Sequence, residues 1–172
     1  MAEDLLAWHD FYVSLVTASA ALLGLLFVAL SLHIRALTDA RNAELRSVAR
    51  SIFLGYVAAL GIGFFALLPQ ALRALGAELL VLFVISTVLF ADAARAGLRA
   101  TGIGFQRNIT IIQFVAGFGF VIVTIGAAIG AIAEQPPALY VIAATAVVGL
   151  LWGVFNTWEL IFRMQSVGGR DD

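Results

Sequence analysis

The stretch NITIIQFVAGFGFVIVTIGAAIGAIA, residues 108–133, contains 26 residues and no charged side chain. A helix of this length rises about 39 Å, which exceeds the roughly 30 Å hydrocarbon core of a bilayer. Three other uncharged runs, with histidine counted as neutral, are similarly long: 11–34, 51–72 and 135–158. Each of these four runs predicts a membrane-spanning helix.

A fifth span is predicted around residues 72–94, although its uncharged part, 79–91, is shorter. Glu78 and Asp92 bracket that part, and a membrane helix tolerates such carboxylates near the interfaces or against protein. Asp92 precedes Arg95 by three residues, so we expect these two to form a local ion pair. The predicted spans are therefore 11–34, 50–69, 72–94, 108–133 and 137–161.

These spans leave little of the chain to fold in water. The predicted fold is all-α, a polytopic membrane helix bundle of about five transmembrane helices that forms a single membrane domain over residues 1–172. The composition agrees, because 62% of residues are hydrophobic and 12% are charged, against about 45–50% and about 25% in soluble domains. We expect the lipid bilayer to be the main partner.

The charge balance and the missing residue types exclude several functions. A formal charge of -1 argues against nucleic acid as a partner, because phosphate binding needs clustered positive charge. The absence of cysteine excludes thiolate metal sites, and the absence of lysine excludes Schiff-base chemistry. No catalytic residue, cofactor or metal site is predicted.

The arginines predict how the chain is oriented. In chain order, the six segments outside the five uncharged runs carry none, four, one, three, none and two of them. Alternate sides of the membrane therefore carry nine and one, and the richer side is expected to be cytoplasmic. This places the N-terminus outside and the C-terminus in the cytoplasm. The exclusive use of arginine is compatible with a bacterial source, so the predicted location is the bacterial inner membrane.

Two connections between spans carry local signals. Apolar residues within 39–50 suggest that the second helix starts early, with Thr38 or Asp39 as its cap, and the alternative is an irregular loop. Pro136 and Pro137 follow Glu134 directly, so we expect a sharp turn between the fourth and fifth spans.

The first span has a weakly polar face. Small and polar residues recur at helical spacing along it, with Asp10 at the outer mouth: Asp10, Ser14, Thr17, Gly24 and Ser31. One interpretation is that they line a water-filled pathway in an oligomer. The alternative is that Ser14 and Thr17 bond back to their own helix and permit packing.

Small residues at four-residue spacing predict close helix contacts, because membrane helices gain little hydrophobic free energy from association and rely on close packing. Three such stripes occur: Gly55, Ala59 and Gly63; Gly126 and Gly130; and Gly149 and Gly153. They predict packing inside a five-helix bundle or, alternatively, against a second subunit.

Glu159 is the ionisable residue that most needs a partner, because it lies one turn from the cytoplasmic end of the fifth span. Arg50 and Arg35 are expected at the same membrane level, so a buried ion pair with one of them is predicted. A proton or cation site is the functional alternative. Gln113 and Asn156 are expected to be buried and to form interhelical hydrogen bonds.

Two segments resemble small bacterial integral membrane proteins that have no assigned activity. One is Trp8-His9-Asp10-Phe11-Tyr12 with ASAALLGLLFVALSL at 18–32, and the other is Asn156-Thr157-Trp158-Glu159-Leu160. The resemblance extends loosely along the whole chain. It implies a bacterial multi-span membrane protein and assigns no reaction.

Three hypotheses for the function follow. The first is a homo-oligomeric, channel-like protein whose pathway is lined by the first helix. The second is a non-enzymatic accessory or regulatory subunit that binds another membrane protein through a glycine-rich face. The third is an intramembrane enzyme or proton-coupled carrier, which would need converging ionisable groups at mid-membrane depth, whereas the charges here gather near the ends of the spans.

Overall fold

The computed structural model describes residues 8–100 and 105–168 of the chain. Within these residues the protein is helical and contains no strand. The elements are α2 (His9–Leu32), α3 (Ile34–Thr38), the 3-10 turn η1 (Ala40–Asn42), α4 (Ala43–Leu67), α5 (Leu72–Ala100), α6 (Phe105–Ile132) and α7 (Pro137–Gly168).

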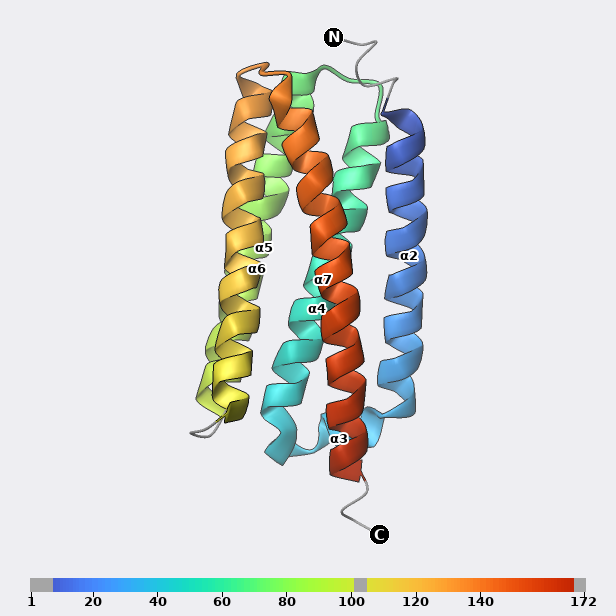
Figure 1. Ribbon diagram of the computed structural model, residues 1–172, viewed down its shortest axis with the longest axis vertical. Helices are drawn as coiled ribbons and strands as arrows, with labels where there is room; N and C mark the ends of the chain where they lie inside the picture. Colours follow the sequence, from blue (N-terminus) through green and yellow to red (C-terminus); the bar gives the residue numbers. More distant parts are fainter. Residues whose placement is uncertain (1–7, 101–104, 169–172) are drawn as a thin grey trace.

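Five of these helices are long and apolar enough to cross a membrane. They are α2, α4, α5, α6 and α7, which lie roughly along one direction (Figure 1). The all-α bundle with five spans is therefore confirmed. The third predicted span, 72–94, begins at the predicted residue but continues to Ala100.

The bundle has two distinct ends. At the lower end in Figure 1, α4 begins, α5 ends, α6 begins and α7 ends, and we call this the arginine-rich end. Seven arginines lie at or near it: Arg35, Arg41, Arg46, Arg50, Arg95, Arg99 and Arg163. The α4–α5 and α6–α7 turns lie at the opposite end. Which end faces the cytoplasm stays a prediction.

The early start of the second span is confirmed, since α4 begins at Ala43. Asp39 acts as a cap, but it caps the short turn η1 before α4, where its side chain accepts a hydrogen bond from the Arg41 backbone N–H. The Arg41 side chain also binds this carboxylate and, together with that N–H, holds the pKa of Asp39 below its usual range. Arg46 closes the loop by donating to the carbonyls of Leu37 and Asp39.

The sharp turn at Pro136 and Pro137 is also confirmed. α6 ends at Ile132, and Pro137 begins α7, where a missing N–H leaves no hydrogen bond unmade. Glu134 adopts a left-handed backbone conformation with φ of 55°. The N–H groups of Glu134 and Gln135 donate to Ala131 and Gly130, so the end of α6 is a Schellman motif with glutamate in the position that glycine usually occupies.

Four helices form a ring and the fifth lies outside it. α4 packs against α5 and α7, and α6 also packs against α5 and α7, so that α4, α5, α6 and α7 enclose a common interior. α2 packs mainly on α4 and touches α7. α2 is therefore not a member of the ring, although it packs against it.

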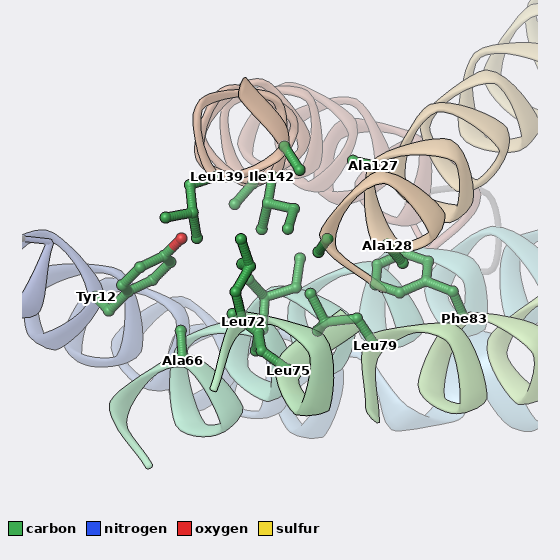
Figure 2. Packing of buried hydrophobic residues seen from close by; sticks show 14 of the residues in the cluster. Tyr12, Ala66, Leu72, Leu75, Leu79, Phe83, Ala127, Ala128, Leu139 and Ile142 are labelled. Atoms are coloured by element: carbon green, nitrogen blue, oxygen red, sulfur yellow. The ribbon is translucent and has the colours of Figure 1, made fainter. Parts of the chain in front are cut away.

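The core of the bundle changes character along its length. Near the opposite end, buried residues from all five spanning helices form one apolar cluster, which we call the apolar plug (Figure 2). It includes Tyr12, Leu75, Leu79, Leu139 and Ile142, each at most 4% exposed. Toward the arginine-rich end, a second apolar cluster contains residues of α2, α3, α4 and α7 but none of α5 or α6.

At the arginine-rich end the bundle thus has two parts, the second apolar cluster and the pair α5 and α6, which contribute no residue to that cluster. α6 and α7 lie together at their turn and diverge away from it (Figure 1). Polar contacts join the two parts there: Ser47 donates to the Ala93 carbonyl, and Arg50 pairs with Asp92 at 2.7 Å. The interior between these polar contacts and the apolar plug is where the candidate site lies.

Candidate functional site: a cavity within the ring of four helices

A cavity of about 120 Å³ lies between α4, α5, α6 and α7. Because a buried water needs roughly 10–15 Å³ measured in the same way, this cavity has room for several waters or one small organic molecule. All four helices contribute to its wall from the central part of their spans. The cavity is therefore a feature of the membrane-spanning region.

The wall of the cavity is mostly apolar, with a set of uncharged polar residues. Aromatic rings come from Phe83, Phe90, Phe120 and Trp152. The polar lining residues are Ser51, Ser86, Gln113, Thr124, Thr145 and Asn156. No lining residue is charged. The cavity thus offers hydrogen-bonding groups to a ligand without a counter-charge for an ion.

Small residues explain why the cavity is open. Gly55 of α4 and Gly149 of α7 both line it, and a Cβ atom added at either position would meet nothing within 4 Å. At two other glycines of the wall an aromatic ring occupies the space of the missing side chain: the ring of Tyr56 at Gly153 and the ring of Phe90 at Gly117. The open cavity therefore depends on the missing side chains of Gly55 and Gly149.

Asn156 and Gln113 are the most informative residues of the wall. The Asn156 side chain, 5% exposed, donates through Nδ2 to the Trp152 carbonyl one turn earlier, at 2.7 Å. Its Oδ1 is buried and has no hydrogen-bond partner, and the same holds for the Gln113 Oε1. The predicted burial of Asn156 is correct. The predicted interhelical bond is not found for Asn156, because its Nδ2 donates to a carbonyl of its own helix and its Oδ1 has no partner.

An ionic cluster lies next to the cavity at the arginine-rich end. Arg163 of α7 contacts Glu159 at 3.1 Å and Glu44 of α4 at 3.6 Å. Thr110 of α6, which is fully buried, donates to the same Glu44 carboxylate at 2.8 Å. Glu44 thereby links α4, α6 and α7 near the arginine-rich end, where the second apolar cluster contains no residue of α6.

The predicted partners of Glu159 were wrong. Glu159 pairs with Arg163, one helical turn later, and Arg50 pairs with Asp92 across the α4–α5 contact. Arg35 lies exposed in α3. The predicted Asp92–Arg95 pair is replaced by this interhelical pair, because α4 brings Arg50 to α5 at the level of Asp92.

The polar face of α2 lies on the outside of the bundle. Its residues Asp10, Ser14, Thr17, Gly24 and Ser31 are all exposed, and none lines the cavity. The three hydroxyl groups donate to carbonyls of α2 itself: Ser14 to Asp10, Thr17 to Val13 and Ser31 to Phe27. The back-bonding interpretation is thus correct for these hydroxyls, and a pathway in an oligomer stays a prediction.

The predicted glycine stripes have mixed outcomes. Gly63 packs against Val16 of α2, Gly130 lies near Ala138, Gly153 contacts Tyr56, and Ala59 is buried. Gly126 meets nothing within 4 Å and makes no close contact with a neighbouring helix. Among the described glycines, the closest approach to backbone atoms of another helix occurs outside these stripes: a Cβ at Gly76 would lie 2.6 Å from the Ala128 carbonyl oxygen and 2.7 Å from the Ile132 nitrogen.

Sequence reasoning missed the cavity and the roles of Glu44, Thr110 and Arg163. The Glu159–Arg163 pair has the four-residue spacing of a local helical ion pair and could have been found from the sequence. The cavity could not, because it depends on which helix faces meet. Comparison of the chain with protein-family models, with curated proteins and with solved structures finds no match, so the site rests on its own geometry.

Proposed function

We propose that this multi-pass membrane protein conducts small solutes across a bacterial inner membrane, along a path inside each chain between α4, α5, α6 and α7. The observation that carries the proposal is the polar-lined cavity in the membrane-spanning part of the ring. The path differs from the one predicted along α2, because the cavity wall contains no α2 residue.

The cavity is unfavourable for a purely structural bundle. Membrane helices depend on close packing, and a void removes those contacts. Polar groups in an apolar medium are also destabilising unless they are hydrogen-bonded. A structural core would be more stable with Leu or Ile in place of Gly55, Gln113, Gly149 and Asn156. Their presence in one wall supports a cavity that is kept open for an occupant.

The residues at the two ends of the cavity support a path that is closed at one end. The apolar plug separates the cavity from the opposite end, and its leucines Leu75 and Leu79 are fully buried. Toward the arginine-rich end, the polar series continues from Asn156 to Glu159 on α7 and from Gln113 to Thr110 on α6. Movement at the plug would connect the cavity to the opposite side.

The test is solute flux into proteoliposomes, measured with glycerol and water by stopped-flow light scattering. We expect permeability above that of protein-free vesicles, a further increase in Leu79→Ala, which thins the plug, and a return to the protein-free rate in Gly149→Leu, which fills the cavity. Gly126→Leu is the matched control, because its side chain enters open space outside the cavity. Protein-free rates in both the wild type and Leu79→Ala would refute the proposal.

A second candidate is the homo-oligomeric, ion-channel-like assembly with α2 at the axis. The observation in its favour is that the polar face of α2 is not covered by another helix of the described chain. Since the chain has no cysteine, single cysteines report contacts cleanly. If α2 lines an axis, Thr17→Cys will form disulfide-linked dimers on oxidation, whereas Val84→Cys, on the exposed side of α5, will not.

Native mass spectrometry in nanodiscs gives the stoichiometry for this second candidate. A ring of about four to six chains is expected if α2 lines an axis. A monomer without Thr17→Cys cross-links would exclude the axial pathway. That result would leave the path inside each chain, or the alternative of an accessory or regulatory subunit bound to another membrane protein.

A further inference from the structure

We infer that the cavity between α4, α5, α6 and α7 selects small, neutral molecules that donate hydrogen bonds. The inference rests on the proposed function for the choice of site and adds the chemical class of the occupant. Three observations carry it: two orphaned acceptors, hydroxyl groups whose hydrogens are already used, and the absence of charge in the wall.

The orphaned acceptors are the amide oxygens of Asn156 and Gln113, which approach the cavity from α7 and α6. The Nδ2 of Asn156 donates to the Trp152 carbonyl, which orients the amide and leaves Oδ1 as an acceptor for an occupant. Buried polar atoms are almost always hydrogen-bonded in native proteins. A hydrogen-bond donor in the cavity that reaches these oxygens would supply the missing partner.

The hydroxyl groups of the wall add acceptors and few donors. Ser51 donates to the Val48 carbonyl, Thr124 to that of Phe120, and Thr145 to that of Val141, each at 2.7 or 2.8 Å. Because each hydroxyl has one hydrogen, these groups offer only lone pairs to an occupant. These three hydroxyl groups and the two amide oxygens therefore complement a molecule that donates hydrogen bonds.

The rest of the wall sets the charge and size of the molecule. No charged residue lines the cavity, so an ion would lose its hydration without gaining a counter-charge. The aromatic rings of Phe83, Phe90, Phe120 and Trp152 favour an apolar body. An apolar cavity of about 150 Å³ in another protein accommodates benzene, and about 120 Å³ is close to that size. Small alcohols and phenols fit both conditions.

The test compares two probes of nearly equal shape that differ in one donor, 4-fluorophenol and 4-fluorotoluene. Each is titrated against the full chain in nanodiscs, and fluorine NMR separates bound probe from probe dissolved in lipid, with empty nanodiscs as reference. We expect saturable binding of 4-fluorophenol at least tenfold tighter than that of 4-fluorotoluene, as expected for a hydrogen bond to a buried acceptor.

Three variants locate the binding. Asn156→Leu and Gln113→Leu should each weaken 4-fluorophenol binding by roughly tenfold while leaving 4-fluorotoluene almost unchanged. Asn108→Leu, an exposed amide of α6 outside the cavity, is the matched control and should change neither affinity. Gly149→Leu, which fills the cavity, should abolish the binding of both probes.

Equal affinities for the two probes, or an Asn156→Leu/Gln113→Leu double variant that binds 4-fluorophenol normally, would overturn the inference. Selective binding without solute flux would uphold the donor selectivity and refute only the conduction proposal. Flux that Gly149→Leu blocks, with equal affinities for both probes, would uphold conduction and refute the donor selectivity. The two proposals can therefore fail separately.

Discussion

Gly76→Ala is expected to lower the free energy of unfolding by about 1–3 kcal/mol, although alanine is the better helix former. The added Cβ would lie 2.6 Å from the Ala128 carbonyl oxygen and 2.7 Å from the Ile132 nitrogen. Both are backbone atoms of α6, so no side-chain rotation relieves the overlap and α5 must move away from α6. Unfolding in mixed micelles with increasing SDS measures the loss.

Gly126→Ala provides the matched control, since its Cβ would meet nothing within 4 Å. It should leave the protein equally stable or stabilise it by up to about 1 kcal/mol through helix propensity. If Gly76→Ala and Gly126→Ala unfolded at the same SDS fraction, the close α5–α6 contact described here would be wrong. The comparison thus tests the helix pairing itself.

Arg163→Leu is expected to destabilise the protein by about 2–4 kcal/mol, because removing one partner from a largely buried ion pair leaves the other charge unpaired. The side chains of Arg163 and Glu44 are 12% and 19% exposed. Without Arg163, the Glu44 carboxylate would keep only the hydrogen bond from Thr110 among the contacts described above. The Glu159 carboxylate, which is 38% exposed, contributes less because water screens it.

The double variant Arg163→Leu/Glu44→Gln should recover a large part of this loss. A glutamine oxygen can still accept the hydrogen bond from Thr110, and no carboxylate then remains unpaired at that position. Asp92→Asn serves as the comparison: its pair with Arg50 is exposed, at 64% and 46%, and should change stability by less than about 1 kcal/mol. A loss in Arg163→Leu as small as in Asp92→Asn would contradict the assignment.

The spans could be predicted from the sequence because the bilayer imposes a simple condition on length and charge. Runs such as 108–133 satisfy it without any knowledge of neighbouring helices. The start of α4 before residue 50 is suggested by the apolar residues within 39–50, and the turn at Pro136 follows from the local rule for proline. Each of these features is decided within one segment of the chain.

The candidate site could be predicted only in part, because it depends on which faces of the helices meet. Spanning helices are apolar nearly all round, so the sequence gives little indication of which face turns inward. Gln113 and Asn156 stood out as polar residues in apolar runs, and both line the cavity. Glu44 did not stand out, because its role depends on Thr110 and Arg163 in other helices.

The polar face of α2 also shows that a sequence pattern does not say which way a helix face turns. The regular spacing of its residues suggested that they line a pathway. In the structure, each hydroxyl donates a hydrogen bond to a carbonyl one turn earlier in α2, and the face points outward. Spacing along a helix identifies a face but does not say what that face contacts. Only the packing of the helices shows that the cavity lies between α4, α5, α6 and α7.

The ring of four helices has a consequence for biogenesis. In chain order, α4, α5 and α6 enter the bilayer before α7, and the ring closes only when α7 packs on both α4 and α6. Until then, Gln113 in α6 and Glu44 in α4 lack the surroundings that α7 supplies through Asn156 and Arg163. A nascent chain paused before α7 would expose Gln113 to lipid and leave Glu44 without Arg163, and membrane quality control would have these polar groups to recognise.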